Sequence, residues 1–264
     1  GRPFRLAEGP LLRARLLRLS AEEHVLLVTM HHIVSDGWTR GILNREVGLL
    51  YGAFRAGAPS PLPELALQYA DYAEWQRRWL DGEVLERQLA YWKRELEGAP
   101  LVLALPTDHP RPRVRTHRGA QRSVVLSAEL SKALKDLARR EGATLYMTLL
   151  AALDVLLYRS TGQSDFLVGT SVSNRTRAET EKLIGFFINA LVLRARLTPE
   201  LSFVELLARV RETCLGAYAH QDMPFERLVQ ELAPEPDPSR TPVFQVIFTM
   251  HNAPPEAMKL PGLT

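Results

Sequence analysis

Apolar residues at the start of the chain follow the patterns of a β-hairpin and then of helices. Leu11–Leu19 and His24–Ile33 are typical of β-strands, and the short polar link between them, residues 20–23, predicts a hairpin. Helical spacing of apolar residues follows over residues 42–54, and two amphipathic helices are predicted over Gln68–Leu80 and Glu83–Glu97. We expect the tryptophans and the tyrosine of these two helices to pack rather than to bind a cofactor.

The second half of the chain again interleaves strands with helices. A stretch with four prolines, Pro100–Thr116, is rich in arginine and predicts an extended linker and a domain boundary. Beyond it, strands are predicted over Gln121–Leu126, Phe166–Val172, Ile188–Leu197 and Val243–Thr249, and helices over Glu129–Glu141, Leu145–Tyr158, Phe203–Ala219 and Phe225–Leu232. This order predicts an α/β protein with two lobes, residues 1–116 and 117–264.

Composition narrows the possible functions. The 264 residues carry 33 basic and 30 acidic side chains, and this balance gives no support for nucleic-acid binding. No apolar run is long enough to span a bilayer, so we expect no membrane partner. The only cysteine, Cys214, excludes an internal disulfide and any cysteine-rich metal site, and it fits a reducing, cytoplasmic location.

The stretch from Met30 to Trp38 contains two adjacent histidines between a predicted strand and a predicted helix. Ser35 or Asp36 is expected to cap that helix. If the strand includes His31 and His32, their side chains point to opposite faces, so they cannot share a metal ion and only one can face a cleft. Alternation alone leaves open which one does. A neutral imidazole beside a helix N-terminus can accept a proton and lies near N–H groups suited to a developing oxyanion.

Other catalytic patterns are absent from the sequence. There is no P-loop, no dinucleotide-binding glycine pattern and no His-Glu-x-x-His pair. The stretch over residues 169–173 fails the Gly-x-Ser-x-Gly pattern of serine hydrolases. Nucleotide hydrolysis, dinucleotide redox chemistry and serine hydrolysis therefore lose support, and histidine-assisted group transfer gains it.

Five ordered motifs give the sequence a resemblance to the condensation domains of nonribosomal peptide synthetases. Residues 31–37 resemble the His-His-x-x-x-Asp-Gly motif, which is shared with other acyltransferases of the chloramphenicol-acetyltransferase-like superfamily. Residues 69–75 resemble Tyr-x-Asp-aromatic-Ala-x-Trp, and residues 184–189 resemble Gly-x-Phe-Val-Asn with Ile188 for valine. Residues 220–226 resemble His-Gln-Asp-x-Pro-Phe-Glu, and residues 237–242 resemble the end of Arg-Asp-x-Ser-Arg-x-Pro.

The resemblance implies a fold of two chloramphenicol-acetyltransferase-like lobes with the active histidines in a tunnel between them. The motifs that open the family's pattern are absent, and the family continues beyond Thr264. We therefore expect an internal piece, with the end of the first lobe and the start of the second, that is inactive in isolation.

The implied reaction is peptide-bond formation in the biosynthesis of secondary metabolites such as antibiotics. A donor acyl thioester on the phosphopantetheine arm of one carrier protein is attacked by the amine of an aminoacyl group on a second carrier. The partners are these upstream and downstream carrier domains and an adenylation domain of the same assembly line. No cofactor is expected to bind this chain directly, since phosphopantetheine arrives on the carriers.

The resemblance also implies roles for individual residues. His32 is the catalytic candidate, either as the base for the amine or as a group that orients the amine and hydrogen-bonds the tetrahedral intermediate. His31, Asp36 and Gly37 are expected to shape the active site, and the N–H of Gly37 is a candidate donor to the thioester oxygen. Further candidates are Trp38 and Asn189 as lining of the substrate tunnel, and Arg240 as a partner of Asp36. Core packing for Trp38 and a satisfied buried amide for Asn189 are the structural alternatives.

Three related functions stay open at this point. A histidine acyltransferase of the same superfamily would move the acyl group to a free alcohol or amine. An epimerising relative would invert a tethered residue, and a non-catalytic recruitment domain would share the fold without the chemistry.

Overall fold

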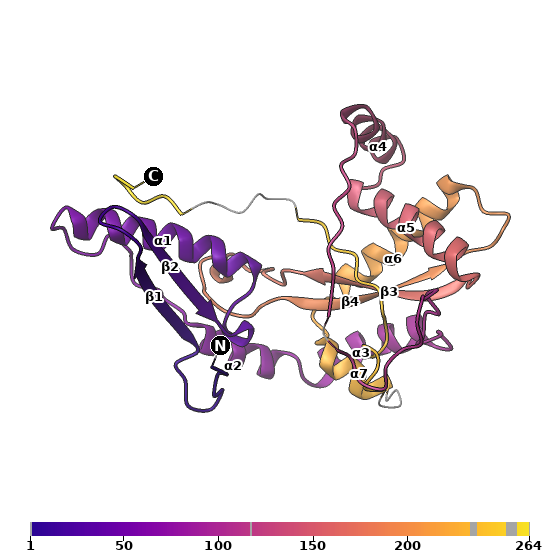
Figure 1. The fold of residues 1–264 in the computed structure, drawn as a ribbon. Helices are drawn as coiled ribbons and strands as arrows, with labels where there is room; N and C mark the ends of the chain where they lie inside the picture. The colour runs from indigo at the N-terminus through magenta and orange to yellow at the C-terminus, as the bar shows by residue number, and fades with distance from the viewer. Residues whose placement is uncertain (1, 117, 233–236, 252–257, 264) are drawn as a thin grey trace. The chain divides into compact units, whose positions relative to one another are not determined.

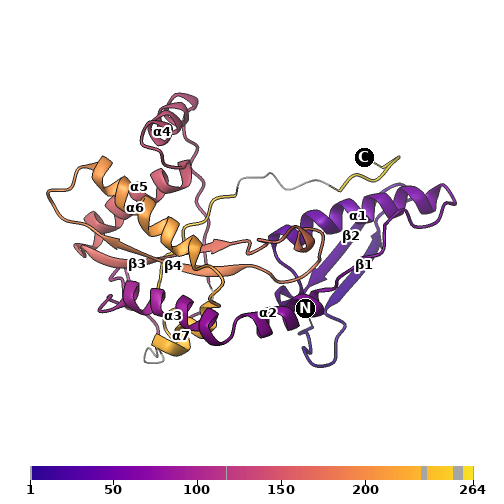
Figure 2. The same ribbon diagram turned by 180° about the vertical axis from the view of Figure 1, so that it is seen from behind.

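The computed structural model describes residues 2–116, 118–232, 237–251 and 258–263, which divide into two compact units. The first unit contains the described residues among 1–79, 173–188 and 252–264, and the second those among 80–172 and 189–251. Figures 1 and 2 show the chain from two opposite sides. Both units combine strands with helices, so the α/β class is confirmed. The lobe boundary predicted at residue 116 concerns the complete family fold and stays a prediction.

The first unit begins with the predicted hairpin. Strands β1 (Leu12–Arg18) and β2 (His24–Met30) pair antiparallel, with Leu12 opposite Met30 and Arg18 opposite His24. The hydroxyl of Ser20 accepts hydrogen bonds from the N–H groups of Glu22 and Glu23 and so fixes the tight turn. Many apolar side chains of this hairpin are exposed: Leu12, Leu16, Leu17, Val25, Leu26, Leu27 and Val28.

Two helices complete the described core of the first unit. After a single 3₁₀ turn, η1 (His32–Val34), helix α1 spans Gly37–Arg55, and helix α2 spans Tyr69–Trp79. A short 3₁₀ turn, η2 (Ala178–Thr180), lies in the segment 173–188 that returns to this unit. This return brings residues of the Gly-x-Phe-Val-Asn stretch into the same unit as the two histidines.

The second unit is built on a long antiparallel ribbon. Strands β3 (Asp165–Val172) and β4 (Asn189–Arg196) pair from Asp165 opposite Arg196 to Val172 opposite Asn189. Helices α5 (Leu145–Thr161) and α6 (Phe203–Ala219) lie on one side of the ribbon, and α3 (Gly82–Leu96) and α7 (Phe225–Leu232) on the other (Figures 1 and 2). Helix α4 (Ala128–Arg140) packs against α5.

The hydrophobic core of the second unit lies between these layers. Its largest fully buried side chains come from both strands, from α3 and α6, and from the segment just before α7: Trp92, Phe166, Leu167, Leu191, Leu207 and Met223. Each predicted helix of this unit is present with ends within three residues of the prediction, and α3, α4, α5 and α6 each begin at a residue whose side chain caps the helix. Thr144, for example, caps α5, and Gly162 ends it in the left-handed conformation.

Two predicted strands are wrong. Residues 121–126 form no strand, and Val124 and Val125 are 84% and 93% exposed, because no neighbouring strand in the described part of the chain pairs with them. Residues 243–249 form only an isolated parallel bridge, from Ile247 to Gly169. Val243 has a φ of 70°, and the N–H of Phe244 bonds back to the carbonyl of Pro242, so a tight turn replaces the start of that strand.

Candidate functional site

The histidine pair lies just beyond the end of β2, not within it. The strand ends at Met30, and His31 is the residue before the 3₁₀ turn that starts at His32. The predicted strand up to Ile33 is therefore too long, and the alternation argument does not apply to the pair. The polar residues after Met30 explain the early end, since their side chains bond to nearby backbone: Nδ1 of His31 accepts from the N–H of Ile33 at 3.0 Å, and the hydroxyl of Ser35 donates to the carbonyl of His31 at 3.2 Å.

The two histidines have different surroundings. The ring of His31 is half-buried and meets the ring of Phe4 edge-on, with 5.8 Å between centroids. His32 is exposed, and its ring meets the ring of Phe186 edge-on at 5.3 Å. Within the part of this unit that the structure describes, His31 is thus tied into the turn by its ring nitrogen, whereas the imidazole of His32 is open to an incoming molecule.

Asp36 begins α1 and connects it to the returning segment. One carboxylate oxygen accepts from the N–H of Thr39 at 2.8 Å, which is the predicted N-cap, and the other accepts from the N–H of Phe187 at 3.1 Å. Arg175 lies 3.4 Å from both oxygens. The carboxylate therefore joins three parts of the unit, and its negative charge also suits the N-terminus of a helix.

Arg175 is the arginine that the structure places beside Asp36 within the first unit. Arg240, in the second unit, forms an ion pair with Asp237, three residues before it, at 3.1 Å, and its predicted pairing with Asp36 stays a prediction. Arg175 lies directly after Asn174, whose φ of 51° turns the chain at that point. Asp36 and Arg175 are 139 positions apart in the sequence, which explains why no local pattern predicted the pair.

The guanidinium of Arg175 holds the returning segment together. It donates hydrogen bonds to the carbonyls of Thr180 and Leu183, the second at 2.9 Å, and it lies 3.9 Å from the centroid of the Phe187 ring. The side chains of Arg175 and Asp36 are 1% and 3% exposed. Burial lowers the pKa of the Arg175 guanidinium from its usual value, and the neighbouring Asp36 opposes that change.

We expect Asp36→Asn to lower the free energy of unfolding by about 3 kcal/mol, because Arg175 would keep a buried charge without a carboxylate. Asparagine still offers an oxygen to the helix cap, so little of the loss would come from capping. Urea unfolding measures the effect. Asp237→Asn, which weakens the half-exposed pair with Arg240, is the control and should change stability far less. Equal losses in the two variants would contradict this account of the buried pair.

The remaining predicted site residues have distinct environments. Gly37 is exposed, and a Cβ at this position would meet no atom within 4 Å, so no described part of the protein requires glycine there. A role of the Gly37 N–H as a donor to a ligand stays a prediction. Trp38 is 49% exposed, and its indole N–H donates to the carbonyl of Glu181 at 2.9 Å. A tunnel-lining role for Trp38 stays a prediction.

Asn189 uses its whole amide within the second unit. Its nitrogen donates to the carbonyls of Gln221 and Met223 at 2.8 and 2.7 Å, and its oxygen accepts from the N–H groups of Ala190 and Phe225 at 2.9 and 3.1 Å. An amide side chain can make about four such bonds, and all are made here. The geometry favours the satisfied buried amide, and the tunnel-lining role of Asn189 stays a prediction.

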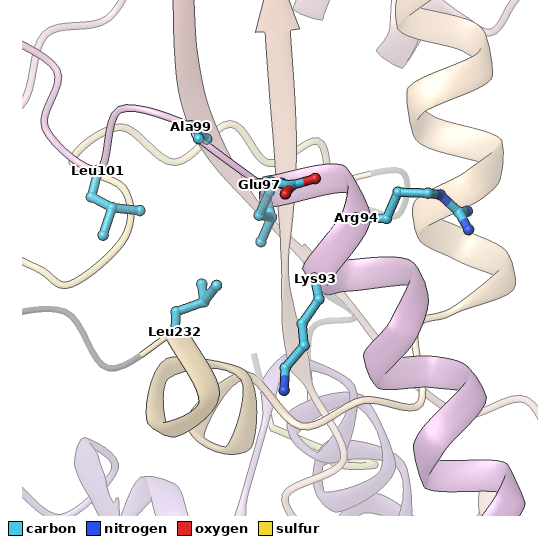
Figure 3. Close-up of a pocket in the computed structure, with 8 residues that line it drawn as sticks. Lys93, Arg94, Glu97, Ala99, Leu101 and Leu232 are labelled. Carbon is cyan, nitrogen blue, oxygen red and sulfur yellow. The ribbon is translucent and has the colours of Figure 1, made fainter.

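A pocket of about 430 Å³ lies in the second unit, between the end of α3 and the end of α7 (Figure 3). Its lining combines charged and apolar side chains but none of the predicted site residues: Lys93, Arg94, Leu96, Glu97, Gly98, Ala99, Leu101 and Leu232. The described residues hold no group of three or more His, Cys, Asp and Glu side chains arranged to bind a metal ion. Among the described helices none could cross a membrane alone, and only α4 and α5 together, across a bend of 104°, have the length and composition.

Comparisons with known proteins identify the family. The family model described as "Condensation domain" matches residues 1–260. A linear gramicidin synthase chain from Brevibacillus parabrevis is 56% identical over 98% of this chain, which spans 3% of that protein. Phosphinothricin tripeptide synthetase PhsC of Streptomyces viridochromogenes is 49% identical over 95% of this chain, which spans 23% of that protein.

Solved structures agree with this assignment. The X-domain from teicoplanin biosynthesis has a TM-score of 0.87 at 34% identity, over 93% of this chain and 56% of that one. The first condensation domain of the CDA synthetase has a TM-score of 0.69 at 25% identity, over 96% of this chain and 54% of that one. The sequence match over residues 1–260 and the shared α/β fold lead to one conclusion: the chain belongs to the condensation-domain family.

Proposed function

We propose that this chain forms the histidine-bearing part of a condensation domain that makes peptide bonds in nonribosomal peptide synthesis. The donor is an acyl thioester on one carrier domain, and the acceptor is the amine of an aminoacyl group on a second carrier. The family assignment supports peptide-bond formation in general. The observation that supports the residue-level proposal is the exposed imidazole of His32, located one turn before the capped N-terminus of α1.

The proposed chemistry divides into attack and collapse. The amine nitrogen forms a bond to the thioester carbon, negative charge develops on the thioester oxygen, and the carbon–sulfur bond then breaks. A proton leaves the nitrogen and finally reaches the sulfur, so a free thiol remains on the donor carrier. In this proposal His32 holds and moves that proton, and the N–H of Gly37 donates to the developing charge.

The pKa of the acceptor amine indicates which of the two roles of His32 contributes more to the rate. An α-amino group has a pKa of about 7.7–8.0, so about a tenth is already neutral at pH 7. A base therefore gives limited help with the first deprotonation, whereas orientation of the two reactants can supply several kcal/mol. We propose that His32 mainly positions the amine and transfers its proton as the bond forms.

The complete domain, in this proposal, adds residues that this chain lacks. The chain spans 51–58% of most of the solved single-domain relatives, and apolar side chains of its hairpin are exposed. We therefore propose two chloramphenicol-acetyltransferase-like lobes in the complete domain, both incomplete here, carrier and adenylation domains as partners, and a cytoplasmic location. Phosphopantetheine would be supplied by the carriers.

A recruitment role is the second candidate. The X-domain from teicoplanin biosynthesis, which has also been solved in complex with OxyB, matches 93% of this chain. The presence of both histidines and of an accessible His32 favours catalysis over recruitment.

Reconstitution of the complete domain with two loaded carriers tests the proposal. We expect an amide-linked product on the acceptor carrier that requires both carriers. Acylation of a free alcohol or amine without the acceptor carrier would indicate the related acyltransferase, and inversion of a tethered residue the epimerising relative. A folded domain that forms no product with loaded carriers would contradict the proposal and favour recruitment.

A further inference from the structure

Among the described residues of its unit, the imidazole of His32 finds no hydrogen bond of the kind that usually orients a catalytic histidine. In most such sites the second ring nitrogen bonds to a carboxylate or a carbonyl, which fixes both the tautomer and the ring plane. His31 shows such a bond, since its Nδ1 accepts from Ile33. For His32, the described residues of its unit provide no hydrogen-bond partner for either ring nitrogen. They provide one ring contact, with Phe186, at 5.3 Å between centroids and 83° between planes.

The backbone around Phe186 is held on both sides. Its carbonyl accepts from the hydroxyl of Tyr69 at 2.7 Å. The residue before it, Gly185, exchanges two hydrogen bonds with the hydroxyl of Thr39, at 2.9 and 3.1 Å. The residue after it, Phe187, donates its N–H to Asp36. Three successive residues of the returning segment are thus tied to the starts of α1 and α2.

Gly185 also shows how closely this segment is packed. A Cβ on Gly185 would collide with the ring of Tyr69, so the chain can follow this path only with glycine at that position. Burial raises the pKa of the Tyr69 hydroxyl, with a further contribution from Asp36, so this group stays a donor at neutral pH. Phe186 is therefore presented to His32 from a fixed backbone.

We propose that Phe186 is the positioning residue of His32 and sets the plane of the imidazole by edge-to-face contact in place of a hydrogen bond. The proposal rests on the proposed function, because it concerns the geometry of the same reaction. The family motif leaves this position open (it is the x of Gly-x-Phe-Val-Asn), so the resemblance assigns Phe186 no role. The contact also leaves both ring nitrogens of His32 free. Both proposed roles of His32, orienting the amine and transferring its proton, require free ring nitrogens.

Kinetics of the complete domain with loaded carriers test the inference. Phe186→Leu should lower kcat about threefold to tenfold, the range expected for the loss of one aromatic pair, with little change in KM for the acceptor carrier. Phe186→Tyr keeps the ring and should retain wild-type kcat within about twofold. Phe4→Leu is the matched control, since it removes the corresponding edge-on contact of His31, and should leave kcat unchanged.

A spectroscopic readout separates positioning from general stability. In Phe186→Leu the ring proton resonances of His32 should lose the ring-current shift due to Phe186, and in Phe186→Tyr they should keep it. If Phe186→Leu unfolds early, Phe186→Met, with a flexible apolar side chain of similar size, replaces it in both experiments. Three results would overturn the inference: a wild-type kcat in the folded Leu or Met variant, an effect confined to KM, or His32 ring resonances in that variant at the same positions as in the wild type.

The inference and the proposed function can fail separately. A folded, complete wild-type domain that forms no amide with loaded carriers would remove the proposed function, and the role of Phe186 with it. Loss of condensation by His32→Ala combined with full kcat in Phe186→Leu would remove only the role of Phe186.

Discussion

Replacement of His32 by alanine in the complete domain lowers the rate of amide formation by at least about a hundredfold, in our expectation. A positioned imidazole that handles a proton during bond formation typically contributes 10²–10⁴-fold to a rate. The loss should appear in kcat with loaded carriers, because His32 is proposed to position the reacting amine and to transfer its proton. His32 is exposed and has no hydrogen-bond partner among the described residues of its unit. For the same reason the melting temperature should be close to that of the wild type.

His24→Ala is the matched control for this experiment. His24 is exposed at the start of β2, the strand that leads to His32. In the described structure it contacts no predicted site residue. We expect it to condense at the wild-type rate. Quench-flow measurement of the acyl group transferred to the acceptor carrier follows both variants. Condensation by a folded His32→Ala variant at the wild-type rate would exclude His32 from the chemistry.

The local features of the site could be predicted from the sequence, but its long-range contacts could not. The cap at Asp36 and the hairpin before it follow from residues within a few positions of one another. The pair between Asp36 and Arg175 and the contact between His32 and Phe186 join residues more than a hundred positions apart. No periodicity or cap signal carries such information.

The errors in the fold have a related cause. Strand propensity predicted a strand at Val124 and Val125, but a strand forms only where a second strand pairs with it. The helices were predicted more accurately than the strands, because the hydrogen bonds of a helix are internal. Capping residues also mark helix ends: Ser202, for example, forms a capping box with Glu205 at the start of α6. The predicted strand before the histidine pair was too long for a local reason: the side chain of His31 hydrogen-bonds to nearby backbone and so competes with strand pairing.

The stability of the second unit should fall as the pH rises, because of Asp154 in the middle of α5. This carboxyl is 3% exposed, and its Oδ1 has no hydrogen-bond partner among the described residues. Burial raises the pKa of Asp154 to about 8. Two titratable groups interact electrostatically with Asp154: Tyr146, on the same helix, and Cys214, on α6. Burial raises the pKa of each to about 12, so both stay neutral between pH 4 and pH 8.5.

The direction of the effect follows from proton binding. Between about pH 4 and pH 8 the native state keeps the proton of Asp154, whereas the unfolded chain, with a pKa near 3.9, releases it. The native state binds more protons, so the free energy of unfolding falls by about 1.4 kcal/mol for each pH step of one in this window. The contribution is complete below pH 4 and lost above pH 8, with a total on the order of 5 kcal/mol.

Asp154→Asn removes this titration and should therefore gain stability relative to the wild type as the pH rises. We expect the difference in unfolding free energy between variant and wild type, measured by urea unfolding at pH 5 and pH 8.5, to grow by about 4 kcal/mol. Groups that titrate equally in both proteins cancel in this difference. Asp136→Asn is the control on α4, because Lys132 lowers the pKa of that exposed carboxyl, and it should show no such growth. A constant difference for Asp154→Asn would mean that the carboxyl ionises normally and finds a partner when it does.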